Sequence, residues 1–437
     1  STLPDAVVVD SQATVSEDAT VATIAVDYDT EVPVANTASA DTVISLNGAS
    51  ISVDGEGAVV DGTTVTINAA GTYAIEGTLD DGQVRVEAGE EDVVTLLLAG
   101  ASITNADSAA IYVLSADDVI VTLAAGTQNT LTDGANYVFE AADEDEPNAA
   151  LFSKEDLTIN GDGALTVTGN YNHGIVSKDD LLITGGVLDV TAVNDGLKGR
   201  DSVVIAAGDI TINAGGDGIQ SNNDEDAEKG YVAIEGGVLT INSALDGIQA
   251  ESVLQVGGGK VDIVTGGGSI TSLEILDTSF RNGPIEGNSN QTLDSNKGLK
   301  AGIGVSIFGG EITISSLDDA LHSNSVVTIN GGVIELASGD DAVHADDALT
   351  TNGGMVSIIQ SYEGLESQII TINDGVIHLT ASDDGINATD GGAGGVPGPG
   401  VEYGDNYVYI NGGYLYINSG GDGLDSNGNF AMSGGIV

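Results

Sequence analysis

The feature that most constrains the fold is a recurring triplet made of a polar residue, then Gly or Ala, then an aliphatic residue. Five of the nine intervals between successive triplets are 22 residues, a sixth is 21, and three are longer. A constant period of this length is typical of a solenoid, because one repeat cannot bury its own apolar face and must stack on its neighbours. The triplets begin at His173, Asp195, Asp217, Asp246, Lys297, Asp319, Asp341, Glu363, Asp384 and Asp422.

Alternating apolar residues within each repeat indicate short strands. Val327 and Ile329 precede a Gly-Gly turn, and Ile334 and Leu336 follow it. A period of two is the pattern of a β-strand rather than a helix. The aliphatic residue of the triplet supplies a third inward position. We therefore predict an all-β, right-handed parallel β-helix with coils of about 22 residues, each with three short strands, stacked about 4.8 Å apart.

The repeat also suggests how the chain is divided. Residues 1–41 carry no triplet and are expected to be an N-terminal extension or linker, whereas residues 42–437 are expected to form the β-helix. Coils over 42–148 are less regular, and the 22-residue register covers 149–437. The sequence stops inside a strand, where an apolar cross-section would need a cap, so we expect the native polypeptide to continue past Val437.

Charge limits the partners of such a chain. Asp and Glu total 67 against 10 Lys and Arg, which gives a formal net charge of -57 and argues against a nucleic-acid partner. Calcium and neutral or calcium-bridged polysaccharides stay open. No Cys is present, and no apolar run reaches the length of a membrane span. The sequence starts without Met or a signal peptide, which fits a processed protein in an extracellular or cell-surface location.

Acidic residues recur at the triplet on consecutive coils and at the position before it. Carboxylates about 4.8 Å apart repel one another unless a cation lies between them, and Ca²⁺ accepts carboxylate oxygens with little angular demand. Alternatively, these side chains cap turn amides and their pKa values rise. The candidate calcium ligands are Asp318, Asp319, Asp340, Asp341, Glu363, Asp383, Asp384 and Asp422.

Basic residues gather at the same corner of the predicted coils. Lys154, Lys178 and Arg200 fall on successive coils, and Lys198 and Lys300 follow the triplet. One interpretation is a groove for an acidic polysaccharide, since Lys and Arg bind carboxylates. Another is local neutralisation, because Glu155, Asp179 and Asp201 directly follow the first three. A third is calcium-dependent lyase chemistry with Lys198 or Lys300 as the base and Arg200 nearby.

Two further groups are candidate ligand contacts. His322 and His344 fall on adjacent coils and could bind a polysaccharide, or hold a transition metal with Asp346. Four tyrosines alternate with apolar residues near the end of the sequence and could offer a stacking platform for sugars, although Tyr is also an ordinary strand residue. They are Tyr407, Tyr409, Tyr414 and Tyr416.

The motifs around the triplet resemble a known family. DDALHSN (318–324), SGDDAVHAD (338–346), SYEGLES (361–367), SDDGINA (382–388) and GGDGLDSNG (420–428) are similar to the polysaccharide-lyase-like β-helix family of carbohydrate-binding domain-containing proteins. The resemblance covers the chain from about residue 42. It implies a secreted or surface β-helix with calcium between coils and affinity for cellulose or pectin-like polygalacturonate, and lyase ancestry rather than lyase activity.

Three functions follow as hypotheses. The first is a carbohydrate-binding protein that attaches to polysaccharide, with calcium as a staple between acidic turns. The second is a structural adhesin or filament subunit that associates head to tail through its apolar ends. The third is an active calcium-dependent polysaccharide lyase.

Overall fold

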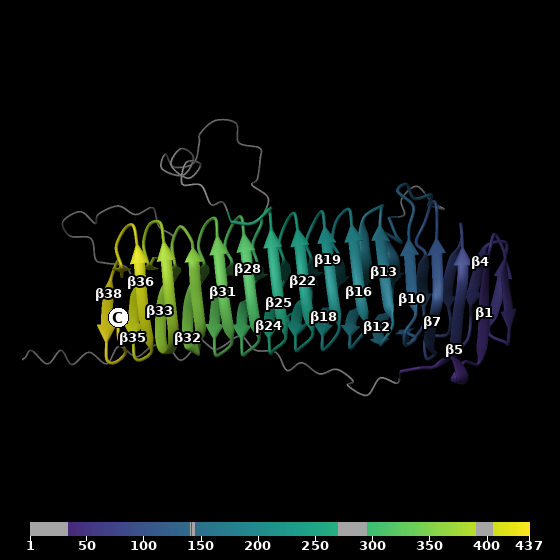
Figure 1. The fold of residues 1–437 in the computed structure, drawn as a ribbon, viewed down its shortest axis with the longest axis horizontal. Helices are drawn as coiled ribbons and strands as arrows, with labels where there is room; N and C mark the ends of the chain where they lie inside the picture. The colour runs from purple at the N-terminus through teal and green to yellow at the C-terminus, as the bar shows by residue number, and fades with distance from the viewer. Residues whose placement is uncertain (1–33, 140, 142–144, 270–294, 390–404) are drawn as a thin grey trace, which may run out of the picture.

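The computed structural model describes residues 34–139, 141, 145–269, 295–389 and 405–437, so most of the predicted extension, residues 1–33, lies outside the described part. Within the described residues the chain is all-β apart from one short 3-10 helix, η1 (Thr37–Ser39). Among those residues no helix is long and apolar enough to cross a membrane. Figure 1 shows the strands side by side in chain order along one elongated body.

From β8 (Ile111–Ser115) onward, most strands pair in parallel with the third strand after them. Ile175 lies opposite Leu197, which lies opposite Ile219, a shift of 22 residues at each step. Each repeat therefore adds one strand to each of three columns. Column 1 contains β8 (Ile111–Ser115), β11 (Ala149–Ser153), β14 (His173–Ser177), β17 (Leu197–Gly199), β20 (Ile219–Ser221), β23 (Ile248–Ala250), β26 (Leu299–Ala301), β29 (Leu321–Ser323), β34 (Ile386–Ala388) and β37 (Leu424–Asp425).

The other two columns follow the same order within each repeat. Column 2 contains β9 (Asp118–Leu123), β12 (Asp156–Gly161), β15 (Asp180–Ile183), β18 (Ser202–Ile205), β21 (Tyr231–Ile234), β24 (Val253–Val256), β27 (Gly304–Ile307), β30 (Val326–Ile329), β35 (Tyr407–Ile410) and β38 (Asn429–Met432). Column 3 contains β10 (Gln128–Thr132), β13 (Ala164–Gly169), β16 (Val187–Ala192), β19 (Asp209–Ala214), β22 (Val238–Ser243), β25 (Lys260–Thr265), β28 (Glu311–Ser316), β31 (Val333–Ser338) and β36 (Tyr414–Ser419). Two long strands, β32 (Val343–Gln360) and β33 (Leu365–Ala381), run through all three columns.

The N-terminal strands are less regular. They are β1 (Thr42–Gly48), β2 (Ile51–Asp54), β3 (Ala58–Asp61), β4 (Thr64–Ile67), β5 (Gly71–Leu79), β6 (Gln83–Glu87) and β7 (Val93–Thr104). β1 pairs antiparallel with β2, and β3 with β4, whereas β4, β6 and β8 pair in parallel and lead into column 1. The antiparallel pairs therefore lie at the start of the stack, before the parallel register begins.

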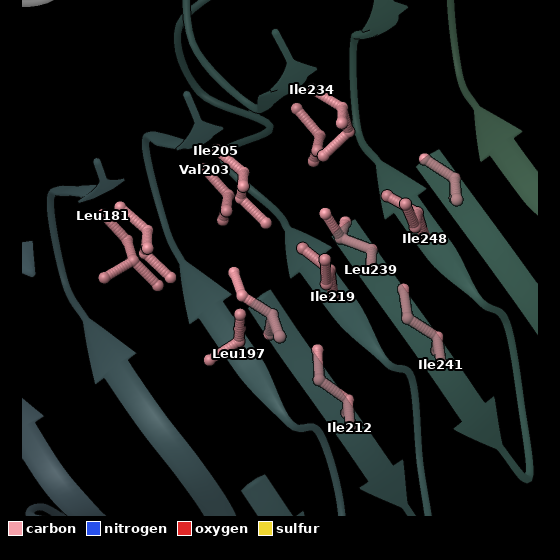
Figure 2. Packing of buried hydrophobic residues seen from close by; sticks show 14 of the residues in the cluster. Leu181, Leu197, Val203, Ile205, Ile212, Ile219, Ile234, Leu239, Ile241 and Ile248 are labelled. Atoms are coloured by element: carbon pink, nitrogen blue, oxygen red, sulfur yellow. The ribbon is translucent and has the colours of Figure 1, made fainter. Parts of the chain in front are cut away.

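The core is a set of aliphatic ladders. Figure 2 shows Leu197, Ile219 and Ile248 of column 1 facing side chains of the other columns, such as Ile212 and Ile241. All five are at most 1% exposed. Burying such a side chain contributes about 1.5–3 kcal/mol, so each repeat is stabilised only when its neighbours cover it.

The turn between columns 2 and 3 keeps successive repeats close together. Gly332 has a φ of 96°, a region that favours glycine, and an added Cβ would lie 3.2 Å from the carbonyl of Gly309 in the preceding repeat. Beside this turn Asn352 donates its side-chain amide to Asn330, and Asn373 donates to Asn352, both at 2.9 Å. These asparagine hydrogen bonds hold successive repeats in register at the surface.

Candidate functional site

The candidate site lies where column 3 turns into column 1. The first residues of the triplets form one line here, named the acid column: Asp195, Asp217, Asp246, Lys297, Asp319, Asp341, Glu363, Asp384 and Asp422. Three residues further along each repeat, partly exposed side chains form a parallel line, named the outer row: Lys198, Gln220, Gln249, Lys300, His322, His344, Glu366 and Asn387. Both lines follow from the period, because residues 22 positions apart stack.

One oxygen of six aspartates in the acid column has a structural role. Oδ1 accepts a hydrogen bond from the backbone N–H at the same position of the next repeat. The acceptor–donor pairs are Asp195–Asp217 (3.0 Å), Asp217–Asp246 (2.9 Å), Asp246–Lys297 (2.8 Å), Asp319–Asp341 (3.1 Å), Asp341–Glu363 (3.2 Å) and Asp384–Asp422 (2.7 Å). The capping alternative raised by the sequence therefore accounts for one oxygen of each of these carboxylates.

In the first half of the acid column the second oxygen of the carboxylate mostly has a partner within the chain. Asp195 Oδ2 lies 3.1 Å from His173 Nδ1 and 3.7 Å from Lys198 Nζ. Asp246 Oδ2 lies 2.9 Å from Lys300 Nζ. Asp217 has only the amide of Gln220, at 2.6 Å. Burial, followed by the charges of Asp246 and Asp195, raises the pKa of Asp217 to about 7.

Lys297 places an ammonium group inside the acid column itself. Its Nζ lies 2.7 Å from Asp318 Oδ2 and 2.9 Å from Asp319 Oδ2, and its side chain is only 14% exposed. His322 Nδ1 lies 2.9 Å from the same Asp319 oxygen. Burial by itself would raise the pKa of Asp319, but the hydrogen bond from His322 and the charge of Lys297 lower it to about 2. Asp319 is therefore an ionised and well-paired carboxylate.

The next two repeats lack such a partner. In the part of the chain that the structure describes, no Lys or Arg forms an ion pair with Asp341, Glu363 or Glu366. Burial, then the charges of Asp340 and Asp319, raises the pKa of Asp341 well above its usual value. Burial, then a hydrogen bond shared with Glu366, raises the pKa of Glu363 to about 8, and burial and Asp341 raise that of Glu366 to about 7. Without a cation beside them, Glu363 and Glu366 therefore keep their protons up to about neutral pH.

His344 lies beside these carboxyl groups. Its Nδ1 is 3.3 Å from Asp341 Oδ2, and its Nε2 is 3.3 Å from Asp346 Oδ1. Ligand atoms of Asp341, His344 and Glu366 all lie within 4.8 Å of one another, as do those of Asp319, His322 and His344 and those of Asp318, Asp319 and Asp340. A pocket of about 400 Å³ opens beside His344 and Glu366. The structure thus groups both histidines with the acid column.

The last candidate calcium ligands are more open to solvent. Asp383 Oδ2 accepts a hydrogen bond of 2.7 Å from the hydroxyl of Tyr362, and Asp422 is exposed. Burial and the charges of Asp383, Asp425 and Asp422 raise the pKa of Asp384. A hydrogen bond from the backbone amide of Asp422 partly offsets this rise. This end of the acid column offers oxygen ligands alone.

The basic corner is neutralised but accessible. Lys154 and Lys178 both face Glu146, with N–O distances of 3.7 and 2.6 Å, and Arg200 lies 2.6 Å from Glu225. These partners come from segments outside the regular strands, rather than from the acids that directly follow Lys154 and Lys178. The three basic side chains are 36–42% exposed. They can therefore contact a ligand without leaving a buried charge behind.

The proposed lyase bases are less favourably placed. Lys198 and Lys300 lie three repeats apart on the outer row, which corresponds to about 14 Å. Lys300 Nζ contacts Asp246 Oδ2 and Ser295 Oγ, and Lys198 Nζ contacts the side-chain oxygen of Gln220. A proton-abstracting base needs a free amine lone pair, whereas these contacts suit a charged ammonium. Arg200 lies on the next turn, paired with Glu225.

The four candidate tyrosines lie on two adjacent columns. Tyr407 and Tyr409 stack on β35 with ring centroids 5.6 Å apart. Tyr414 and Tyr416 lie on β36, are 42% and 55% exposed, and flank His378 at 6.0 and 5.9 Å. They form two small aromatic surfaces on different columns.

Buried apolar side chains mark where the outer row begins. At the equivalent positions of the preceding repeats, Phe152 and Val176 are buried with Tyr112, whose ring lies 5.7 Å from that of Phe152. Nearby, Tyr137 and Tyr171 stack at 4.2 Å. The polar outer row therefore begins at Lys198.

Comparison with known proteins identifies relatives of this chain. A family model described as "carbohydrate-binding domain-containing protein" matches residues 61–342 and 340–437. A protein of that description from Acetivibrio thermocellus is 44% identical over 137 residues, which is 31% of this chain and 48% of the relative, so the match spans about half of the relative's length.

A solved structure gives the same relationship. The polysaccharide lyase-like protein from C. thermocellum, solved as a gadolinium derivative, is 41% identical, with a TM-score of 0.51 over 52% of this chain and 92% of the other. The family resemblance predicted from the triplet motifs is confirmed. This chain belongs to the family of carbohydrate-binding domain-containing proteins.

Proposed function

We propose that this chain is an extracellular or cell-surface protein that attaches to polysaccharide through the outer row of column 1. The observation that carries the proposal is the outer row itself, with one hydrogen-bonding side chain per repeat in continuous register. A polysaccharide also repeats hydroxyl groups along an extended chain, so a periodic row of donors and acceptors suits it. Family membership and the relative described as polysaccharide lyase-like support the same class of ligand.

The proposal includes the fold that presents this row. From β8 onward, parallel pairing of most strands with the third strand after them supports a parallel β-helix, since each turn of such a helix supplies three strands. We take the helix as right-handed because crossover connections between parallel strands almost always have that hand. In that fold the outer row runs along the helix axis. A polysaccharide bound there would lie parallel to the axis and contact several repeats at once.

Calcium is the second part of the proposal. We place it where the acid column has no ammonium partner and offers oxygen ligands, from Asp383 and Asp384 to Asp422. Lys297 already neutralises Asp318 and Asp319, so calcium is not required there.

Retention on polysaccharide tests the proposal. The protein is mixed with cellulose, with immobilised polygalacturonate and with an uncharged control matrix, each in calcium and in chelator. The double variant Gln220→Ala/Gln249→Ala should weaken retention, because it removes two adjacent outer-row side chains. Its control, Thr211→Ala/Thr240→Ala, changes the same two repeats on column 3 and should bind normally. Equal binding by both variants contradicts the outer row as the ligand surface.

The same samples test the basic corner and the enzymatic alternative. Lys178→Gln/Arg200→Gln should weaken binding to polygalacturonate more than to cellulose, because only the former carries carboxylates for the basic side chains to meet. Ultraviolet absorbance of an unsaturated product from polygalacturonate at alkaline pH with calcium would instead reveal a lyase. We expect none, since Lys198 and Lys300 are held by acceptor side chains.

A further inference from the structure

The acid column is not chemically uniform, and one of its positions mixes nitrogen and oxygen ligands. Asp341, His344 and Glu366 come from two neighbouring repeats, on β32 and β33 and the turn before them. Their ligand atoms lie within 4.8 Å of one another. From these contacts we propose that Asp341, His344 and Glu366 form a site for a divalent transition metal ion such as Zn²⁺. The inference does not depend on polysaccharide binding.

The first argument is charge. Every Lys and Arg in the described part of the chain forms an ion pair with a carboxylate other than those of Asp341, Glu363 and Glu366. One repeat earlier, the equivalent carboxylate of Asp319 has the Lys297 ammonium at 2.9 Å. Beside Asp341, the position that corresponds to Lys297 Nζ thus holds no Lys or Arg side chain. A bound cation would supply the missing positive charge.

The second argument is the orientation of the imidazole ring. With a metal ion on Nδ1 the imidazole would carry its proton on Nε2, and Asp346 Oδ1 lies 3.3 Å from Nε2, where it can accept that proton in a hydrogen bond. In that tautomer the Nδ1 lone pair faces Asp341 Oδ2, 3.3 Å away. A carboxylate that orients the far nitrogen of a metal-binding histidine is a common outer partner in metal sites. Asp341 uses Oδ1 for the Glu363 amide, so Oδ2 stays available.

The third argument is access and metal preference. His344 and Glu366 line the pocket of about 400 Å³ that opens to solvent, so an ion can enter and keep a further ligand. Imidazole together with carboxylate favours Zn²⁺ and similar ions, whereas Ca²⁺ takes oxygen ligands. His322 is less suitable as a centre, because its Asp319 partner is already neutralised by Lys297.

Zinc titration of the full chain tests the site. Tag-free protein is freed of metal with chelator and titrated with Zn²⁺ by calorimetry, and with Co²⁺ while the visible spectrum is recorded. Wild type should bind, and His344→Gln should lower the affinity by at least about tenfold. Glu366→Gln should act in the same direction. The matched control is His378→Gln, because His378 lies on column 3 beside Tyr414 and Tyr416, outside this cluster.

The outcomes separate this site from the other proposals. Equal zinc affinity of His344→Gln and wild type, or an equal loss in His378→Gln, overturns the inference, and so does a wild type that gives no heat and no cobalt spectrum. Excess Ca²⁺ should not displace the zinc. Displacement by Ca²⁺ would contradict the proposal that His344 supplies a nitrogen ligand to the site. Circular dichroism melting of each variant without metal checks that the fold is retained. Failure to bind polysaccharide would leave these zinc measurements unchanged.

Discussion

Replacing Lys297 with Met should destabilise the chain strongly at neutral pH. The ammonium group is 14% exposed and contacts Asp319, whose side chain is 4% exposed, and Asp318. Removing one partner of a buried ion pair costs about 3–5 kcal/mol, because the remaining charge is left in a poorly solvated place. His322 still contacts Asp319, so we expect the lower end, about 3 kcal/mol. Thermal melting followed by circular dichroism measures the loss.

The pH dependence of this loss has a definite sign. The folded-state pKa of Asp319 is lowered to about 2, so its stabilising contribution is present above the unfolded pKa and is lost as pH falls through about 2. In Lys297→Met the carboxyl groups protonate more easily. The difference between variant and wild type should therefore be large at pH 7 and shrink towards pH 3.

Two comparisons make the reasoning refutable. Lys260→Met removes an exposed ammonium from Asp262 and Glu311 and should leave the melting temperature unchanged. Millimolar Ca²⁺ should partly restore Lys297→Met, because oxygens of Asp318, Asp319 and Asp340 lie within 4.8 Å of one another. Hydrogen exchange in β26 and β29 should show where the loss is localised. The assigned role of Lys297 is contradicted if Lys297→Met melts like wild type at pH 7 in chelator. It is also contradicted if the loss of stability at pH 3 is as large as the loss at pH 7.

Three other substitutions probe the same stack. The effect of Asp217→Asn on stability should change sign with pH. The rise in the pKa of Asp217 from 3.8 to about 7 corresponds to a destabilisation by the ionised carboxylate of at most about 4 kcal/mol, at about 1.4 kcal/mol per pKa unit. Ionised Asp217 opposes folding as pH rises, so thermal melting should show the variant to be more stable than wild type at pH 8. At pH 4 the variant should be about 1 kcal/mol less stable than wild type, because it loses the hydrogen bond from Gln220. Leu321→Ala should cost about 2–5 kcal/mol in denaturant unfolding, since Leu321 is fully buried, and a smaller loss would mean the repeats close the cavity. Gly332→Ala, at a φ of 96°, should cost about 1–2 kcal/mol. Gly423→Ala offers the comparison, because Gly423 has no positive φ and the added Cβ would have its nearest neighbour at 4.0 Å.

Much of the architecture was readable from the sequence, because the chain repeats one local pattern. The alternation at Val327 and Ile329 predicted inward side chains, and both are fully buried. The 22-residue interval predicted that Leu197 lies next to Ile175, and the parallel register has that pairing. The all-β class and the family resemblance followed from the same residues. The change from antiparallel to parallel strand pairing before β8 could not be predicted, since the spacing of the apolar segments in that part of the sequence is irregular.

The candidate site was only partly readable. Its position followed from the period, which places acids, bases and histidines on one corner. Which carboxylates lack a partner did not follow, because the partners come from other repeats and from insertions of variable length. Glu146 reaches Lys178 across a separation that the 22-residue period does not describe, whereas Lys297 and Asp319 lie one period apart.

The sequence by itself thus determined the repeat, the direction in which side chains point and the line of charged residues. Those properties depend on local alternation and on residues 22 positions apart, both of which are visible in one dimension. Only the tertiary structure decided how the charges are balanced, since electrostatic energy depends on distances and burial in space. It separates an Asp319 paired with Lys297 from an Asp341 that faces His344 and Glu366 alone. The unpaired part of the line is where we expect metal to bind.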